Sequence, residues 1–234
     1  MREKKIVAIN QSNYIPWKGY FDMISMADEF ILYDDMQYTR RDWRNRNKIK
    51  TPHGLLWLTI PVQVKGKFFQ TIKDTLVVDT SWAARHWHTI RSNYTKATCF
   101  EAYREIFEEL YLGSDSLGLS EINYRFLSRI CGILGIRTKL SLSSDYKLIE
   151  GKTERLVDLC QQAGATEYLS GPTAKNYINP KLFERAGIKL TWMDYSGYPE
   201  YPQLYPPFEH AVSIIDLLMN VGPEAPTFMK GFNR

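Results

Sequence analysis

Side chains that could bind a sugar or a nucleobase follow directly on an apolar run near the start of the chain. Residues 6–9 are apolar, and the segment after them contains Gln11, Tyr14 and Trp17. An amide and two aromatic rings at the end of a strand could hydrogen-bond to such a ligand and stack on it. For Tyr14 and Trp17 the alternative is packing in the core or in the turn.

Two adjacent carboxylates, Asp34 and Asp35, end a second apolar run at 29–33. A carboxylate at this place could orient a histidine, bind an amine or hold a magnesium ion. Because neighbouring residues on a strand point to opposite sides, we expect only one of the two to serve the site. The alternative for Asp35 is the cap of a turn.

A basic cluster comes next in the chain, with a single acid, Asp42, inside it. Its members lie within eleven residues and are Arg40, Arg41, Arg44, Arg46, Lys48 and Lys50. On an extended segment Arg44, Arg46 and Lys48 share one side and could clamp a phosphate or a carboxylate. The alternative is a solvated basic loop. The whole chain carries a net charge of only +4, which favours a small anionic ligand over a nucleic acid, and leaves transfer RNA as a less favoured partner.

His86 is the best single candidate for acid–base chemistry. The pattern predicts a helix in which Trp82 precedes His86 by about one turn and Tyr94 follows it by about two, so the three side chains share one face. An imidazole there could take a proton from an amine or hydroxyl acceptor, with Asp34 or Asp35 as its orienting partner. The alternative is a histidine that packs or caps the helix.

The candidate residues can form one site only if the fold brings the ends of their strands together. The pattern of the rest of the chain predicts such a fold. Apolar runs indicate strands, and apolar residues repeated every three or four positions indicate helices. Strands are expected near 6–9, 29–33, 55–62, 76–78, 138–144, 164–171 and 187–193, and helices near 81–94, 100–111, 119–134, 152–163, 180–186 and 213–219.

This order of elements predicts an α/β, Rossmann-like fold, with a mostly parallel sheet, flanking helices and a helical middle section. The N-terminal and C-terminal thirds are expected to share the sheet. We expect one domain, 1–234, with a helical insertion at about 82–135. In such a sheet ligands bind outside the carboxyl ends of the strands, where the polar segments lie.

Composition narrows the class of protein further. The chain has 234 residues, 44% of them hydrophobic, and no apolar run approaches the roughly 20 residues that span a bilayer. Neither a signal peptide nor a disulfide framework is expected, which favours a cytoplasmic setting. Three separated cysteines argue against a metal cage, and Cys99 is the one to test as a nucleophile. No motif names a cofactor, since the Walker, dinucleotide-binding and serine-hydrolase signatures are absent.

Many separated segments resemble, in the same order, the WbqC-like proteins of bacterial surface-polysaccharide gene clusters. They are 11–21, 27–35, 43–46, 57–62, Trp82 with His86 and Tyr94, Gly171-Pro172 with Tyr177, Tyr201-Pro202-Gln203, and 213–222. Ser12 departs from the pattern, because the family usually has proline after the glutamine. The resemblance adds Tyr94, Tyr177, Tyr201 and Gln203 to the expected substrate-binding residues, and the Tyr- and Pro-rich segment 195–207 could lie over the site as a lid.

For activity, the resemblance implies transfer of an aminoacyl group such as glycine, or of an acyl group, onto an amino- or nucleotide-linked sugar during O-antigen (lipopolysaccharide) biosynthesis. Under this hypothesis His86 is the base, and Arg44 and Arg46 clamp the anion. The alternatives are a noncatalytic protein of the same pathway that binds a glycan or a nucleotide, and a transfer-RNA-dependent aminoacyl transferase.

Overall fold

The centre of the molecule is a five-stranded parallel sheet. A computed structural model describes residues 3–113 and 115–232. The sheet has the order β5-β2-β1-β6-β7, and every pair in it is parallel. Its strands are β1 (Ile6–Asn10), β2 (Glu29–Leu32), β5 (Lys139–Leu142), β6 (Glu167–Ser170) and β7 (Lys189–Trp192). This confirms the predicted α/β, Rossmann-like fold and the shared sheet of the two ends of the chain.

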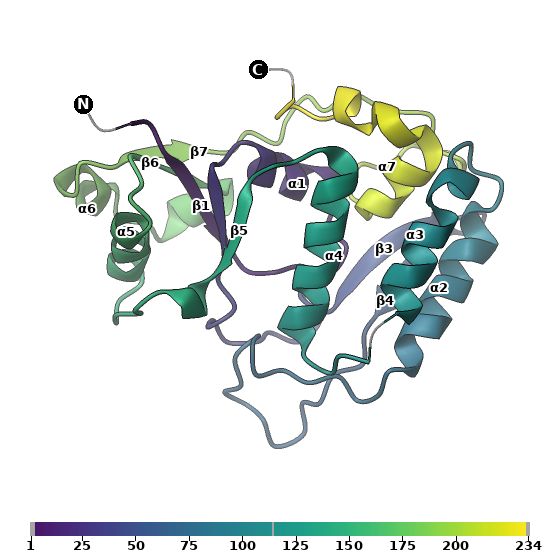
Figure 1. Cartoon of the computed structure of the whole chain (residues 1–234), viewed down its shortest axis with the longest axis horizontal. Helices are drawn as coiled ribbons and strands as arrows, with labels where there is room; N and C mark the ends of the chain where they lie inside the picture. Colours follow the sequence, from purple (N-terminus) through teal and green to yellow (C-terminus); the bar gives the residue numbers. More distant parts are fainter. Residues whose placement is uncertain (1–2, 114, 233–234) are drawn as a thin grey trace.

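Helices cover both faces of the sheet because successive strand residues point to opposite sides. Ala8 and Phe30 pack into one core cluster, whereas Val7, Ile9 and Ile31 pack into a second cluster. The first cluster includes side chains of α1 (Lys18–Ser25), α4 (Leu119–Leu134) and α7 (Ile214–Val221), and the second includes side chains of α5 (Thr153–Gln162) and α6 (Pro180–Arg185). Figure 1 shows α5 and α6 beside the sheet and α4 on its other flank.

The middle of the chain forms a helical block beside the sheet (Figure 1). It consists of α2 (Ser81–Tyr94), α3 (Phe100–Leu112) and α4, and α3 packs against α2, α4 and α7. Their apolar faces join the larger core cluster, as the periodicity predicts. Three short 3-10 helices complete the described elements: η1 (Ser143–Asp145), η2 (Pro172–Asn176) and η3 (Gly222–Phe228).

One predicted strand belongs to a different sheet. β4 (Gly54–Thr59) pairs antiparallel with β3 (Arg46–Thr51) in a separate hairpin. Gly54 closes the hairpin with φ +103°, a backbone conformation that L side chains rarely adopt. The expected strand near 76–78 makes only isolated bridges, from Val77 to Val62 and from Leu76 to Gly118. These segments pair locally, so they do not extend the parallel sheet.

The order of the strands creates a switch point between β1 and β6. From β1 the chain builds outward to β2 and later to β5, whereas β6 and β7 lie on the opposite side of β1. Connections that leave neighbouring strands in opposite directions open a crevice at their carboxyl ends. The segment that follows Asn10 and the segment that follows Ser170 both start at this crevice.

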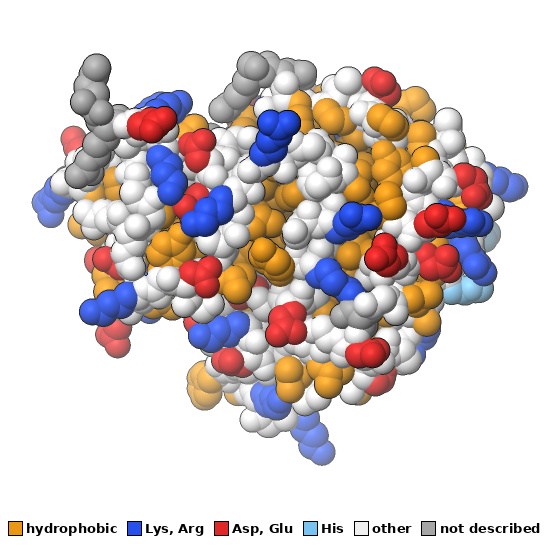
Figure 2. All heavy atoms as spheres, in the orientation of Figure 1, with side chains coloured by type: hydrophobic (Ala, Val, Ile, Leu, Met, Phe, Trp, Pro, Cys, Tyr) orange, Lys and Arg blue, Asp and Glu red, His pale blue; other side chains and the backbone are white. Residues whose placement is uncertain are grey.

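The surface is mixed in charge. On the face shown in Figure 2, acidic and basic side chains are interspersed rather than gathered into fields of one sign. None of the helices in the described residues has the length and the apolar character that a membrane crossing requires.

Candidate functional site

A cleft with a cavity volume of about 970 Å³ lies at the switch point. Asn10 at the end of β1, Tyr33 after β2 and Ser170 at the end of β6 line it. The carboxyl ends of three neighbouring strands therefore form its floor, which is where ligands bind in open α/β sheets. Its volume suits a molecule of nucleotide or nucleotide-sugar size.

The charge that lines the cleft is positive. Arg44, Lys152 and Arg155 contribute to its wall, and the lining residues that the structure describes include no Asp, Glu, His or Cys. Arg155 donates hydrogen bonds to the Ile149 carbonyl and, at 3.3 Å, to the Tyr33 hydroxyl. In the described part of the chain the Lys152 ammonium makes no hydrogen bond or ion pair. Lys152 immediately precedes α5, whose first N–H groups add partial positive charge at the same side of the cleft.

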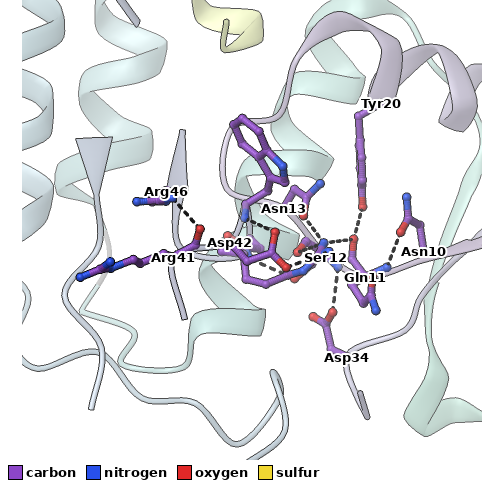
Figure 3. Close-up of polar contacts among 12 residues, drawn as sticks. Asn10, Gln11, Ser12, Asn13, Tyr20, Asp34, Arg41, Asp42 and Arg46 are labelled. Carbon is purple, nitrogen blue, oxygen red and sulfur yellow. Dashed lines mark hydrogen bonds and ion pairs between the residues drawn. The ribbon is translucent and has the colours of Figure 1, made fainter. Parts of the chain in front are cut away.

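Buried polar contacts fix the loop that follows β1 (Figure 3). The Ser12 N–H donates to Asp34 Oδ1 at 2.8 Å, and Ser120 Oγ donates to the other carboxylate oxygen. Asn123 donates to Ser12 Oγ at 2.9 Å and, at the same distance, to the Arg44 carbonyl. Asp34 and Asn123 thus hold the loop directly, and Ser120 of α4 holds Asp34 in place. The protein's own contacts therefore order this loop.

The Arg44 guanidinium holds the same loop from the side of the cleft. It donates to Asn13 Oδ1 and, at 3.4 Å, to the carbonyls of Gln11 and Ser12. Tyr20 donates to the Gln11 carbonyl at 2.7 Å, a contact that Figure 3 also shows. The Asp42 carboxylate lies 3.7 Å from Arg44 and offsets part of its charge. Arg44 therefore both faces the cleft and shapes the loop around it.

An aromatic wall closes the end of the cleft near α1. The Trp17 ring packs edge-on against Tyr195 at 5.3 Å and against Tyr198 at 5.5 Å. A Cβ on Gly19 would lie 2.3 Å from the Trp17 ring, so glycine at this position lets the indole fold over the first turn of α1. Within the proposed lid, Tyr195 reaches the cleft lining, while Tyr201 is buried in the core.

A smaller cavity of about 290 Å³ adjoins the cleft, since Asn13, Trp17 and Trp43 line both. Beyond it the Trp43 ring lies 5.4 Å from the ring of Trp57 on the hairpin. The Arg46 guanidinium stacks over Trp57 at 4.2 Å, a favourable cation–π arrangement. Trp43 thus lies between the cleft and a surface formed by Trp57 and Arg46 of the hairpin.

The tyrosines of the cleft act as neutral phenols at neutral pH. Burial raises the pKa of Tyr33, although the neighbouring Arg155 opposes this shift. Burial also raises the pKa of Tyr195 to about 12. These hydroxyls can therefore donate and accept hydrogen bonds, but none is poised as a phenolate base.

The structure brings four of the residues singled out from the sequence to the cleft. They are Gln11, Trp17, Arg44 and Tyr177. Arg46 and Lys48 lie instead on β3, beside Trp57. Their side chains belong to the hairpin surface and do not line the cleft.

His86 lies on the buried face of α2 and packs against Tyr14 in the core. Tyr14 is fully buried and His86 nearly so. The Thr59 carbonyl, 3.2 Å from Nε2, can only accept, so Nε2 carries the proton and Nδ1 accepts from the Tyr14 hydroxyl at 2.9 Å. Burial lowers the pKa of His86 to about 4. Both ring nitrogens are engaged and neither faces the cleft, so this geometry favours the packing interpretation over the base.

Neither of the adjacent carboxylates lines the cleft. Asp34 is buried under the loop after β1, where it binds Ser12 and Ser120. Asp35 forms an ion pair with Lys73 and accepts from Ser143 Oγ at 2.6 Å. β2 ends at Leu32 and both residues lie in the turn after it, so the strand geometry expected for them does not apply. Each carboxylate is bound by protein groups. In the described chain no three His, Cys, Asp or Glu side chains gather as a metal site.

Tyr94, Tyr201 and Gln203 meet at a different place, around buried Asp216. Tyr94 donates to Asp216 Oδ2 and Tyr201 donates to Oδ1, each at 2.7 Å. Gln203 donates to Oδ1 at 2.8 Å and accepts from the Lys50 ammonium at 3.0 Å. This network joins the C-terminal segment to α2 and β3, and its geometry is that of a structural tie rather than an open binding site.

Sequence reasoning missed several residues of the cleft. Lys152 and Arg155 lie more than 100 residues beyond the basic cluster, and Asn13, Tyr33 and Trp43 were not assigned to the site. One signal was available for Lys152: a Gly-Lys-Thr segment at a helix start, in a chain with an α/β order of elements, indicates an anion-binding turn. Nothing local marks Arg155, which lies in the first turn of α5.

Comparison with known proteins supports a single family. Residues 11–228 match the model of the WbqC-like protein family. A protein of Mycobacterium tuberculosis that carries the name Uncharacterized protein Rv1507c is 55% identical over 226 residues, which cover 97% of this chain and 98% of that protein. No solved structure matched the chain.

Proposed function

Since the chain belongs to the WbqC-like protein family, we propose that it is a cytoplasmic transferase of surface-polysaccharide biosynthesis. Its acceptor is an amino- or nucleotide-linked sugar, and it attaches an aminoacyl group of the glycine type or another acyl group. The sugar-linked anion binds in the switch-point cleft, with the anionic part near Lys152 and Arg155.

The observation that carries this proposal is the charge of the cleft. Three cations and, among the described lining residues, no carboxylate surround a cavity of about 970 Å³. An anion gains from this field, whereas a cation would find no carboxylate among the described lining residues. The rings of Trp17 and Trp43 supply surfaces on which a sugar or a base can stack.

Such a site would promote the reaction mainly by holding the two substrates in position. The acceptor amine attacks the acyl carbonyl, the new N–C bond forms, the bond to the leaving group breaks, and the amine proton passes to the leaving group. A neutral amine can attack without a side-chain base. The cleft would contribute by holding both substrates and by stabilising negative charge on the carbonyl oxygen through Lys152 or Arg155.

A noncatalytic ligand-binding protein is the second candidate. It is favoured by the same lining, in which no imidazole, carboxylate or thiol of the described residues is present. A transfer-RNA-linked donor would instead use the exposed cations Arg40 and Arg41, and its binding would fall steeply with salt.

The first experiment is a thermal-shift and calorimetry screen of nucleotide-sugars, acyl-coenzyme A and amino acids. We expect a nucleotide-sugar to stabilise the wild type, and Arg155→Gln to weaken its binding at least tenfold. Arg129→Gln is the matched control, because Arg129 is exposed on α4 and lies outside the lining. Equal binding by both variants would refute this location.

Mass spectrometry of the products then separates the two candidates. A sugar product heavier by one acyl or aminoacyl group, formed by the wild type and lost in Arg155→Gln, supports the transferase. Tight binding without any product from the donors tested favours the binding protein.

A further inference from the structure

The loop at 63–70 displays two adjacent phenylalanines to solvent. Phe68 is 78% exposed and Phe69 is 84% exposed, the highest values among the large hydrophobic side chains that the structure describes. Their ring centroids are 5.7 Å apart. Single exposed apolar residues are ordinary on protein surfaces, but a pair of nearly bare phenyl rings indicates a contact that the isolated chain leaves unmade.

This 63–70 loop is held in place by hydrogen bonds at its base and along its length. Gln63 donates to the Leu76 carbonyl at 2.8 Å, and Gln70 donates to the Gln63 carbonyl at 2.9 Å. Gln37 donates to the Phe68 carbonyl at 2.9 Å. An ordered loop that keeps two phenyl rings out of the core presents them at little further cost in conformational entropy.

Positive charge accompanies the rings. Lys65 and Lys67 are exposed in the same loop, and residues 63–72 contain no acid. Arg40 donates to the Val64 carbonyl at 3.2 Å, which brings a third cation to the base of the loop. Figures 1 and 2 show this part of the chain projecting at the lower edge of the molecule, with apolar and basic side chains together there.

We propose that the 63–70 loop docks this protein on a membrane surface that contains anionic lipids. Phe68 and Phe69 enter the boundary between headgroups and acyl chains, while Lys65, Lys67 and Arg40 contact the headgroups. The loop has aromatic rings at its tip and cations around them, which matches the polarity of that interface. Insertion of the rings and attraction to the anionic headgroups both contribute to the binding free energy there. The charge favours this occupant over a second copy of the chain, whose loop would be equally positive.

The loop is also connected to the cleft. The segment after the loop pairs with residues 36–38. The Ile72 N–H donates to the Met36 carbonyl at 2.9 Å, and the Tyr38 N–H donates to the Gln70 carbonyl at 3.0 Å. Between them, Gln37 and Thr71 form an isolated antiparallel β-bridge. Met36 lines the cleft. A protein docked through this loop therefore has its cleft tethered near the membrane. The inference does not rest on the proposed transferase activity, because it concerns a separate surface.

The test is co-sedimentation of the full chain with vesicles of phosphatidylcholine, with and without phosphatidylglycerol. We expect the wild type to bind the vesicles that contain phosphatidylglycerol, and added salt to weaken binding. Phe68→Ser together with Phe69→Ser should lower the partition coefficient at least tenfold. Each of Lys65→Gln and Lys67→Gln should lower it about fivefold on anionic vesicles only.

Leu112→Ser is the matched control, because Leu112 is a half-exposed apolar residue on α3, outside the loop. It should sediment with the vesicles as the wild type does. Circular dichroism should give the same melting temperature for the loop variants as for the wild type, since the substituted side chains are exposed. Wild type that stays in the supernatant with both kinds of vesicle overturns the proposal. Sedimentation with vesicles that the Phe68→Ser and Phe69→Ser changes leave intact also overturns it. Sedimentation of the wild type through self-association of these rings, without vesicles, overturns it as well.

Discussion

The carboxylate of Asp34 accepts a hydrogen bond from the backbone N–H of Ser12 at 2.8 Å, and both residues are buried. This contact joins the segment after β2 to the loop after β1, 22 residues earlier. Because β1 and β2 are neighbours in the sheet, their following segments meet at the edge where the cleft opens. Asp34 therefore shapes the loop beside the cleft without lining the cleft itself.

Asp34→Ala should lower the free energy of unfolding by about 1–3 kcal/mol, because it leaves the buried Ser12 N–H without an acceptor. Urea unfolding followed by circular dichroism measures this change. Asp74→Ala is the control, since Asp74 is exposed and accepts from Thr71 at 2.6 Å. Its effect should stay below about 1 kcal/mol. Equal losses in the two variants would contradict a buried role for Asp34.

His86 should make stability depend on pH. Its folded pKa of about 4 lies below the ordinary value of 6.5, so unfolding takes up a proton between these pH values. The stabilisation is fully present above pH 6.5 and is lost as the pH falls toward 4, by up to about 3 kcal/mol. Urea unfolding of wild type and His86→Gln at several pH values measures the difference in slope.

His88→Gln is the control for this experiment, because His88 is exposed on the same helix. Its stability should follow the wild-type pH dependence, whereas His86→Gln should show a shallower one. His86→Gln should also keep wild-type binding of any nucleotide-sugar found in the screen at pH 7.5. Loss of transfer activity with unchanged stability would instead restore His86 as a catalytic candidate.

Gly19→Ala should disturb the aromatic wall of the cleft. The added methyl group would lie 2.3 Å from the Trp17 ring, so the indole must move away from Tyr195 and Tyr198. We expect weaker ligand binding and a shift in tryptophan fluorescence. Gly132→Ala is the matched control on α4, where an added Cβ meets nothing within 4 Å. That change should preserve binding and stabilise the helix by up to about 1 kcal/mol.

Tyr94→Phe should destabilise the fold while leaving the cleft intact. The Tyr94 hydroxyl donates to Asp216 at 2.7 Å and accepts from the Lys50 N–H at 3.1 Å. Losing both contacts at a buried site costs about 1–3 kcal/mol. Thermal unfolding and ligand titration measure the two effects separately. Tyr124→Phe, at an exposed position on α4, should change neither. A selective loss of binding in Tyr94→Phe would return Tyr94 to the binding residues.

Local sequence patterns predicted the scaffold and a few of the side chains that line the cleft. Apolar runs and apolar residues repeated every three or four positions depend on local sequence, so they located β1, β2, the helical block and the later strands. The polar residues after β1 are found at the cleft because any parallel sheet gathers its carboxyl ends at one edge. Gln11 and Trp17, which follow β1, are cleft residues that this rule predicts.

Which candidate side chains face the cleft, and which distant residues join them, depends on long-range packing. Ile15 adopts φ +38°, a turn that sends Tyr14 into the core while Trp17 lines the cleft. Lys152 and Arg155 lie at the cleft because β6 pairs with β1, and no local sequence pattern encodes this long-range pairing. His86 has the residue type of a base, but its burial and its two hydrogen bonds favour a neutral packing role. Residue type sets what a side chain can do, and only its packed surroundings set what it can reach.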